Sequence, residues 1–173
     1  SRDPVRLNSL MEDILDPKNL NRAYSKILSN RGARTPGVDG TTVGELKGYV
    51  RKHWPKIEAQ LRSGDYRPLP VKRVEIPKPG GGVRKLGIPS ALDRLIQQAI
   101  LQVLQPHFDP TFSEHSYGFR PGRSAHQAVA TAQQYQKAGF RHVVDMDHEK
   151  SIDRVHHDLI VTRLAERIGD KLL

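Results

Sequence analysis

The strongest constraint on the fold is a run of apolar residues with helical spacing just past the middle of the chain. Its members recur at intervals of three and four, so a helix would place them on one broad face: Leu92, Leu95, Ile96, Ala99, Ile100, Val103 and Leu104. Ser90 and Asp93 form a capping pair at the start of this helix, and Pro106 is expected to end it. This helix is predicted to lie at the centre of the core.

Shorter amphipathic helices are predicted before it. Residues 7–15 form the first, and a second begins at Pro17 with Asp16 as its cap. Thr42 with Glu45 is a capping box for a third, and Pro55 is expected to restart helical structure, which ends near Gly64. The loop at residues 32–40 contains three glycines, which favours tight turns.

Residues 71–88 have the pattern of a β-hairpin, with strands at 71–76 and 83–88 around a glycine-rich turn. Lys78 and Arg84 fall near its tip, where they could close over a triphosphate, because arginine offers phosphate a two-pronged fork. The alternative is that these charges only protect an edge strand. Six bases and two acids between Lys72 and Arg94 exceed that need, which favours phosphate contact.

Residues 143–153 are predicted to form a strand of a covered sheet, because apolar residues fill much of it. Its acids share a period of two and would face one way: Asp145, Asp147, Glu149 and Asp153. Clustered carboxylates suit a divalent cation such as Mg²⁺. The alternative is an ordinary edge strand whose acids pair with nearby bases, and these residues alone leave both interpretations open.

Aromatic rings stand beside arginines in the loop at residues 116–123, a combination that suits stacking and phosphate contact. The alternative is a well-packed corner. A helix capped by Ser124 and Gln127 follows and is predicted to bury its apolar side: Ala125, Ala128, Val129, Ala132 and Tyr135. Asp158 is predicted to cap a last helix, and His156 and His157 lack the spacing of a zinc motif.

The net charge of +9 indicates a polyanionic partner, most simply nucleic acid, although lipid headgroups or acidic proteins would also fit. The absence of cysteine excludes disulfides, zinc fingers and thiol catalysis. No apolar run reaches the length of a membrane span, and the first 17 residues lack the apolar core of a signal peptide. We therefore expect a soluble, cytoplasmic protein without membrane contact.

Several segments, taken in order, resemble the reverse transcriptases encoded by bacterial group II introns, also called intron maturases. They extend over essentially the whole chain: residues 37–40, 66–79, 86–89, 93–99, 117–121 and 144–147. The resemblance implies an α+β fold, in which helices pack with a β-hairpin and a truncated antiparallel palm sheet of a right-hand polymerase. It divides the chain into an RNA-contacting N-terminal extension (1–40), fingers (41–115) and the start of the palm (116–173).

The resemblance also implies RNA-directed DNA synthesis with two Mg²⁺ ions, an RNA template, a DNA primer and dNTPs, and binding of intron RNA. Asp147 corresponds to the first metal-binding aspartate, and the backbone carbonyl of His148 shares the metal. The nucleotide would be held by Lys78, Arg84, Lys72 and Ile152. Nucleic acid would be contacted by Arg73, Arg94, Gln97, Tyr117, Phe119, Arg120 and Arg123.

The chain departs from the family pattern at His148, Ser151 and Ile152, where the family has apolar or aromatic residues. Ile152 lacks the flat ring expected beneath the nucleotide sugar. Because Leu173 precedes the later palm carboxylates of the family, we expect this chain to be inactive alone, not to bind Mg²⁺ stably, and to self-associate through the cut palm surface. The alternatives are a non-catalytic RNA-binding module that assists intron folding and splicing, or a relative used in defence or repair.

Overall fold

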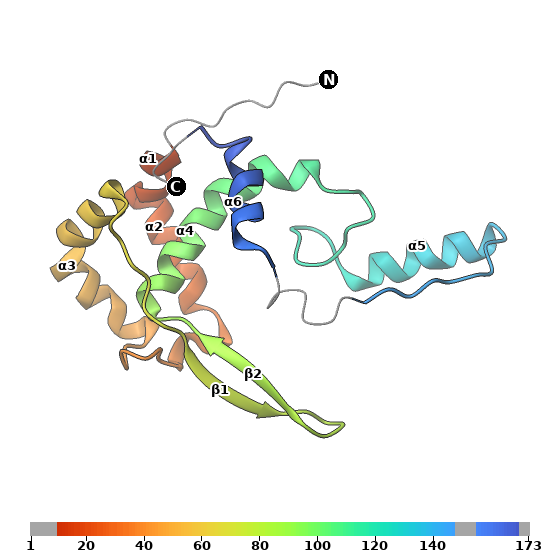
Figure 1. Cartoon of the computed structure of the whole chain (residues 1–173), viewed down its shortest axis with the longest axis horizontal. Helices are drawn as coiled ribbons and strands as arrows, with labels where there is room; N and C mark the ends of the chain where they lie inside the picture. The colour runs from red at the N-terminus through yellow and green to blue at the C-terminus, as the bar shows by residue number, and fades with distance from the viewer. Residues whose placement is uncertain (1–9, 148–154, 170–173) are drawn as a thin grey trace. The chain divides into compact units, whose positions relative to one another are not determined.

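The computed structural model describes residues 10–147 and 155–169, and within them the fold is α+β, as predicted (Figure 1). These residues form six α-helices, two short 3₁₀ turns and one two-stranded antiparallel sheet. In chain order the elements are α1 (Leu10–Leu15), α2 (Pro17–Leu28), η1 (Arg31–Arg34), α3 (Val43–Ser63), β1 (Lys72–Pro77), β2 (Val83–Ile88), α4 (Ala91–Phe108), η2 (Asp109–Thr111), α5 (Ala125–Lys137) and α6 (His157–Ala165).

The chain divides into two compact units. Among the described residues, the first unit comprises residues 10–104 and 165–169, and the second comprises residues 105–147 and 155–164. Every buried apolar side chain of the described residues lies in the first unit, where α1, α2 and α3 contribute to one core with α4. Leu95 and Ala99 of α4 are 3% and 0% exposed, which confirms the predicted apolar stripe.

A buried amide ties α4 to the first two helices. Asn19, 8% exposed, donates from Nδ2 to the carbonyl oxygens of Ile14 (3.0 Å) and Ala99 (3.1 Å). Its own Oδ1 accepts from Nε2 of Gln102 at 2.8 Å. Because each of these polar atoms has a partner, the amide links the helices without an unsatisfied group in the core.

The glycine-rich loop before α3 lies directly against the start of α4. A Cβ atom added to Gly37 would stand 2.7 Å from the Cα atom of Ser90 and 3.1 Å from the carbonyl oxygen of Pro89. Gly40 has a φ angle of +74°, the left-handed region that glycine enters without strain. The predicted turns are therefore present, and Gly37 is needed for close packing rather than for an unusual φ angle.

A buried carboxylate anchors the hairpin to α4. Asp93, 3% exposed, accepts hydrogen bonds from the Tyr66 hydroxyl (2.8 Å), the Leu69 backbone N–H (3.2 Å) and the Ser90 hydroxyl (2.7 Å). The Ser90 hydroxyl also accepts from the N–H of Asp93, so the predicted capping pair is present. Burial, together with the hydrogen bond to Asp93, raises the pKa of Tyr66. The segment that leads into β1 is thus held at the beginning of α4.

Two predicted helix boundaries at prolines are wrong. α3 continues through Pro55, and α4 continues past Pro106 to Phe108. Pro55 is exposed while Leu46 and Ile57 of the same helix are buried, so the packed face holds the helix together where one backbone hydrogen bond is missing. Pro106 lies in the last turn of α4, where few hydrogen bonds depend on it. The predicted caps at Asp16 and Thr42 are confirmed.

The second unit differs from the prediction in its packing. α5 begins after Ser124 with the predicted capping box, but none of its residues is buried, and Val129 is 58% exposed. α6 begins at His157, so Asp158 lies in its first turn and is not its cap.

The predicted acidic strand is not formed over its described part. Residues 143–147 have no ladder partner among the described residues, and Val143 is 93% exposed. A strand is stabilised by pairing and by a covered face, and neither is present here. Residues 148–154, which include His148, Ser151 and Ile152, lie outside the described residues.

Candidate nucleic-acid interface

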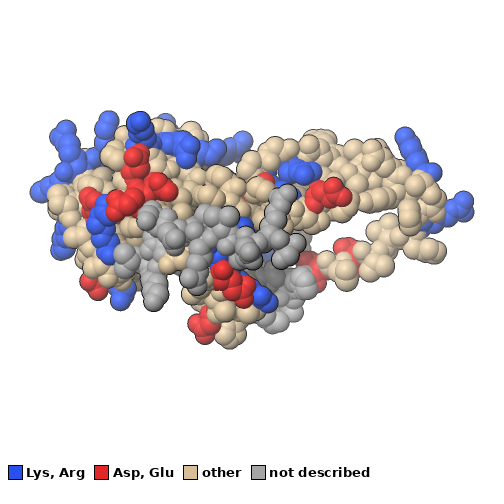
Figure 2. All heavy atoms as spheres, turned by 90° about the horizontal axis from the view of Figure 1, so that it is seen from above, with Lys and Arg blue, Asp and Glu red and all other residues tan. Residues whose placement is uncertain are grey.

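Positive charge is concentrated in the first unit. Residues 10–104 contain 17 Lys and Arg against 9 Asp and Glu, whereas residues 105–147 and 155–164 contain five of each. Figure 2 shows Lys and Arg side chains along much of the outline of the first unit on the face in view. A polyanion would therefore be attracted mainly to this unit.

The pairing of the hairpin places two of the predicted nucleotide-binding residues on one face. β1 pairs with β2 so that Lys72 lies opposite Ile88 and Ile76 lies opposite Arg84. Because side chains alternate along a strand, Lys72 and Arg84 share one face of the ribbon, and Arg73 lies on the other. Lys72 and Arg84 are separated by four residues of strand, or about 13 Å, so Lys72 lies well away from the tip.

The tip of the hairpin brings Lys78 and Arg84 together. Both line an open hollow whose floor is the turn itself, which includes Gly80 and Gly81. The N–H of Lys78 donates to the carbonyl of Gly82 at 3.0 Å, and Gly81 and Gly82 have φ angles of +92° and +81°. Neither cation pairs with an acid in the described part of the chain. The hollow therefore presents two uncompensated cations and accessible backbone.

Arg94 is engaged in the fold of the first unit. Its guanidinium donates to the carbonyl oxygens of Gly32 (2.9 Å) and Thr35 (2.8 Å), which fixes the loop after α2 beside α4. Gln97, one turn further along α4, is exposed and borders a separate apolar cleft with Tyr66. The two residues therefore do not form a single surface with the hairpin tip.

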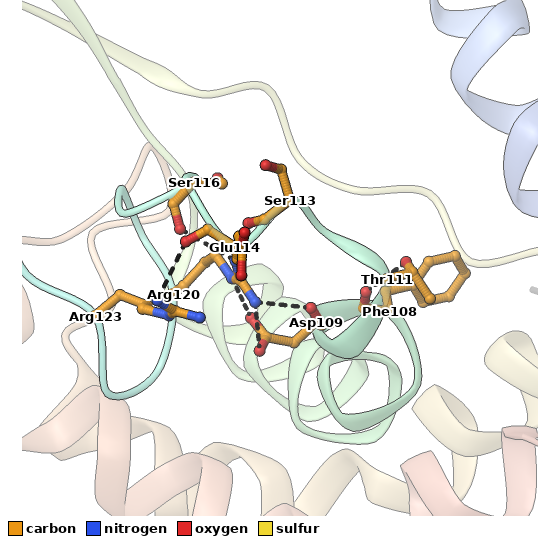
Figure 3. A network of polar contacts seen from close by, with 8 residues as sticks. All are labelled: Phe108, Asp109, Thr111, Ser113, Glu114, Ser116, Arg120 and Arg123. Carbon is orange, nitrogen blue, oxygen red and sulfur yellow. Dashed lines mark hydrogen bonds and ion pairs between the residues drawn. The ribbon is translucent and has the colours of Figure 1, made fainter. Parts of the chain in front are cut away.

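In the second unit, Arg120 is the centre of a polar network (Figure 3). Its side chain is 8% exposed and donates to the Asp109 carboxylate from Nε (3.0 Å) and to the carbonyl oxygens of Ser113 (2.7 Å) and Ser116 (3.1 Å). The hydrogen bond from Arg120 lowers the pKa of Asp109, and the same bond raises the pKa of Arg120. The guanidinium also lies 5.6 Å from the ring centroid of Phe112. Arg120 thus fixes the shape of the loop.

Other residues of this loop are more accessible. Arg123 donates to the carbonyl oxygen of Glu114 (3.2 Å), as Figure 3 shows, and lies 5.7 Å from the ring centroid of Tyr117. Phe119 is fully exposed and has a φ angle of +56°, an unusual conformation for a residue with a side chain. An exposed ring beside an arginine is a suitable surface for stacking a base.

The acidic segment offers oxygen ligands without a completed metal site among the described residues. Asp145 and Asp147 lie two residues apart on an extended, exposed stretch. No group of three potential ligands comes together within residues 10–147 and 155–169. In the same ranges, no helix is both long enough and apolar enough to cross a membrane.

Sequence reasoning missed the partners that hold these residues. Asp93 was recognised as a helix-capping residue. Its hydrogen bonds to Tyr66 and Leu69 could not be predicted from local sequence patterns, because these residues are more than twenty positions away. Asp109 as the partner of Arg120 was missed for the same reason. The bases of α3 were not singled out from the sequence, although the spacing of Lys47, Arg51, Lys52 and Lys56 could have indicated them. The structure shows that they are exposed and form no ion pair with an acid among the described residues.

Comparison with known proteins supports a polymerase relationship. The family model for reverse transcriptase (RNA-dependent DNA polymerase) matches residues 76–171. The chain is 39% identical to Protein YkfC of Escherichia coli K12 and 35% identical to the group II intron-encoded protein LtrA of Lactococcus lactis, over 97% and 86% of its own length. It is 32% identical to the putative COX1/OXI3 intron 1 protein of Saccharomyces cerevisiae over 95% of its length.

The matched regions are only part of these relatives. The chain spans 45% of the length of YkfC, 24% of LtrA and 19% of the yeast intron protein. Two of the three are named as products of introns, which confirms the likeness inferred from the ordered motifs. The chain belongs to the reverse transcriptase (RNA-dependent DNA polymerase) family.

Proposed function

We propose that this chain is the N-terminal part of an RNA-directed DNA polymerase of the group II intron type. In this proposal it supplies the N-terminal extension (1–40), the fingers (41–115) and the start of the palm (116–173) of a right-hand polymerase. The observation that carries the proposal is the hairpin tip, where Lys78 and Arg84 line one hollow in the strongly basic unit of a reverse-transcriptase chain.

The hairpin tip has the chemistry needed to hold a nucleoside triphosphate. The triphosphate carries several negative charges on tetrahedral oxygens, which an arginine fork and a lysine ammonium can both contact. Because the turn residues Gly80, Gly81 and Gly82 have no side chains, the same oxygens could also approach the backbone closely. An isolated two-stranded ribbon is only marginally stable, so contact with the triphosphate would also order the tip.

Lys72 lies too far along the ribbon to share the terminal phosphates. At about 13 Å from Arg84 it is better placed to contact the template or the base-paired end of the nucleotide. Ile152 is proposed to lie beneath the nucleotide sugar, where it would provide apolar contact but no flat ring. Arg73, on the opposite face, would contact nucleic acid rather than the nucleotide.

The acidic segment fits a Mg²⁺ ion by its donor chemistry. Mg²⁺ is commonly held by one or two carboxylates together with substrate phosphates, and Asp147 offers an exposed carboxylate of this kind. The backbone carbonyl of His148 would supply a further oxygen. When bound, such metal ions neutralise the developing charge on the phosphates during nucleotidyl transfer. The chain's own contribution would be the exposed Asp147 carboxylate as one ligand of the metal.

A non-catalytic RNA-binding role for this chain is favoured by a separate observation. Most of the excess positive charge of residues 10–104 lies outside the hairpin tip, so it is not required for nucleotide binding. It would serve intron RNA or template RNA through phosphate contacts. In the second unit, Tyr117, Phe119 and Arg123 would add stacking, and Arg120 would position their loop. In the first unit, Arg94 would position the loop after α2, and the exposed Gln97 would contact the nucleic acid.

The second unit also suggests self-association. Apolar side chains of α5 and the following segment are exposed and border one groove: Val129, Tyr135, Phe140, Val143 and Val144. A second copy of the chain would cover this surface and reduce its contact with water. Light scattering at increasing protein concentration should show dimers or larger species, and a monomer at high concentration would contradict this part of the proposal.

Nucleotide binding can be tested at the hairpin with a matched control. Lys78→Gln and Arg84→Gln should each weaken binding of a fluorescent dATP analogue, because each removes a cation from the hollow. Lys85→Gln removes the same charge from the opposite face of the ribbon and should leave binding nearly unchanged. Equal losses in all three variants would mean that only overall charge attracts the nucleotide, and no loss would place the nucleotide elsewhere.

A further inference from the structure

The outer face of α3 carries bases that have no role inside the described structure. They are exposed, and none forms an ion pair or a side-chain hydrogen bond with another described residue: Lys47, Arg51, Lys52 and Lys56. Arg62, near the end of the same helix, is different, because it pairs with Glu12 and Glu58. The four bases therefore form an uncompensated patch, which we call the α3 basic face.

The two acids of α3 form no ion pair with the four bases of this face and are outnumbered by them. Glu45 accepts hydrogen bonds from the N–H (2.9 Å) and hydroxyl (2.6 Å) of Thr42 in the capping box, which lowers its pKa. Glu58 is bound to Arg62 at 2.9 Å. The charge of the α3 basic face is thus available to an external anion.

The bases stand in two rows along the helix. With 3.6 residues per turn, Lys47 and Arg51 form one row, and Lys52 and Lys56 form the other. Within a row the two positions are about 6 Å apart along the axis, and the rows lie on opposite flanks of a cylinder about 10 Å across. This arrangement fits a partner with two parallel lines of phosphate groups better than it fits a single small anion.

Between the rows the helix surface is smooth. The positions there are small or compact: Gly44, Gly48, Pro55 and Ala59. A Cβ atom added to Gly48 would meet nothing within 4 Å, and one added to Gly44 would meet only Thr42 Oγ1 at 4.0 Å. Internal packing therefore does not require these glycines, although glycine is unfavourable inside a helix. The smooth strip would let a partner approach the backbone between the two rows.

We infer that the α3 basic face binds double-helical RNA through its phosphates. The wide, shallow minor groove of an A-form helix accepts a flat surface, with phosphates on both sides for the two rows. The strip offers no polar side chain to read base edges, so binding would be independent of sequence. This inference deepens the RNA binding proposed above, on which it rests.

Two other anionic partners fit the face less well. A single strand needs free aromatic rings for its bases, but the Tyr49 ring already packs against His53, with centroids 4.5 Å apart and the rings tilted by 37°. An anionic membrane would need an accessible apolar side on the helix, whereas Val43 and Leu46 of that side are 0% and 1% exposed within the core.

The test is the salt dependence of binding to an RNA duplex of about 20 base pairs, measured by fluorescence anisotropy. The double variants Lys47→Gln/Arg51→Gln and Lys52→Gln/Lys56→Gln should each lower the slope of log affinity against log salt by about two, with a loss of roughly tenfold or more at about 0.1 M salt. The control Lys137→Gln/Arg141→Gln removes the same charge from exposed positions of the second unit, so the slope and the affinity should both stay close to those of the wild type.

A second variant tests, without changing the charge, whether the RNA approaches the backbone of α3 closely. Gly48→Leu adds a bulky side chain where the structure has open space, so thermal stability should be retained or raised while the affinity for duplex RNA falls. Ala130→Leu on the exposed side of α5 is the matched control and should not affect binding.

The outcomes distinguish this inference from the proposed function. If the wild-type chain binds RNA but neither row variant changes the slope, the α3 assignment is wrong while RNA binding stands. If the wild-type chain binds no RNA, the proposed RNA binding itself fails. Equal affinity for a single strand, or for a DNA duplex of the same sequence, would overturn the assignment to double-helical RNA.

Discussion

The close contact at Gly37 makes a sharp prediction about how the first unit is held together. In Gly37→Ala the new methyl carbon would lie 2.7 Å from Ser90 Cα and 2.9 Å from its backbone nitrogen. Carbon atoms normally pack at about 3.5–4.0 Å, so the loop or the start of α4 must move by about 0.8 Å or more. The obstacle is backbone, which cannot rotate away as a flexible side chain would.

The displacement would reach the network that anchors the hairpin. Ser90 is 1% exposed, and its hydroxyl bonds to Asp93 at 2.7 Å, which in turn holds Tyr66. Overpacking of this kind destabilises a fold by about 1–3 kcal/mol. At about 4 °C per kcal/mol, a loss of about 2 kcal/mol lowers the melting temperature by roughly 8 °C.

The assay is thermal unfolding followed by circular dichroism, with Gly32→Ala as the control. Gly32 lies in the same loop region, has no positive φ angle, and would meet nothing within 4 Å if it carried a Cβ atom. Its substitution should leave the melting temperature unchanged or slightly raised. If Gly37→Ala melted within about 1 °C of wild type, the reasoning from close backbone contact would be refuted, since even 1 kcal/mol shifts the midpoint by more.

Three further predictions concern single interactions. Tyr66→Phe removes a hydrogen bond to the buried Asp93 carboxylate and should cost about 1–3 kcal/mol in urea unfolding, and an unchanged midpoint would mean that water replaces the hydroxyl. Arg94→Lys loses the fork that joins the carbonyls of Gly32 and Thr35, so proteolysis of that loop should accelerate, whereas cleavage at wild-type rate would show that the fork is dispensable. Asp109→Asn tests the ion pair with Arg120, which lowers the pKa of Asp109 in the folded state. The stabilisation from this pair is therefore fully present above the unfolded pKa of about 3.9. It is lost as the pH falls through the lower pKa of the folded state. The difference in melting temperature between wild type and Asp109→Asn should therefore shrink between about pH 5 and pH 3, and a constant difference would contradict the pairing.

Much of the first unit could be predicted from local pattern, because its signals are short in range. The caps at Asp16 and Thr42, the hairpin and the apolar stripe of α4 depend on residues a few positions apart. The helix boundaries predicted at prolines were wrong, because packing of a buried face stabilises the helix across Pro55 despite one missing backbone hydrogen bond.

The second unit and the site were less predictable, because their order depends on distant partners. Helical spacing correctly located α5, but spacing cannot say whether another element covers its apolar side. The acidic segment was mispredicted for the same reason. Residues 143–147 have the sequence pattern of a strand, but a strand forms only where a neighbouring strand pairs with it. At the site, Lys78 and Arg84 were found because they flank one turn, while the partners of Arg94 lie about sixty residues away.

The most direct test of the central claim is primer extension on an RNA template with Mg²⁺ and dNTPs. The chain would be mixed with a second polypeptide that carries the remainder of a similar group II intron protein, and product length would be read on a denaturing gel. The account predicts DNA synthesis in the mixture that is abolished by Asp147→Asn and preserved by Asp39→Asn, an exposed carboxylate in the loop before α3. Synthesis that survives Asp147→Asn would contradict the assignment of the first metal ligand. No synthesis by the wild-type mixture, despite salt-sensitive RNA binding, would contradict the polymerase role and leave the RNA-binding role.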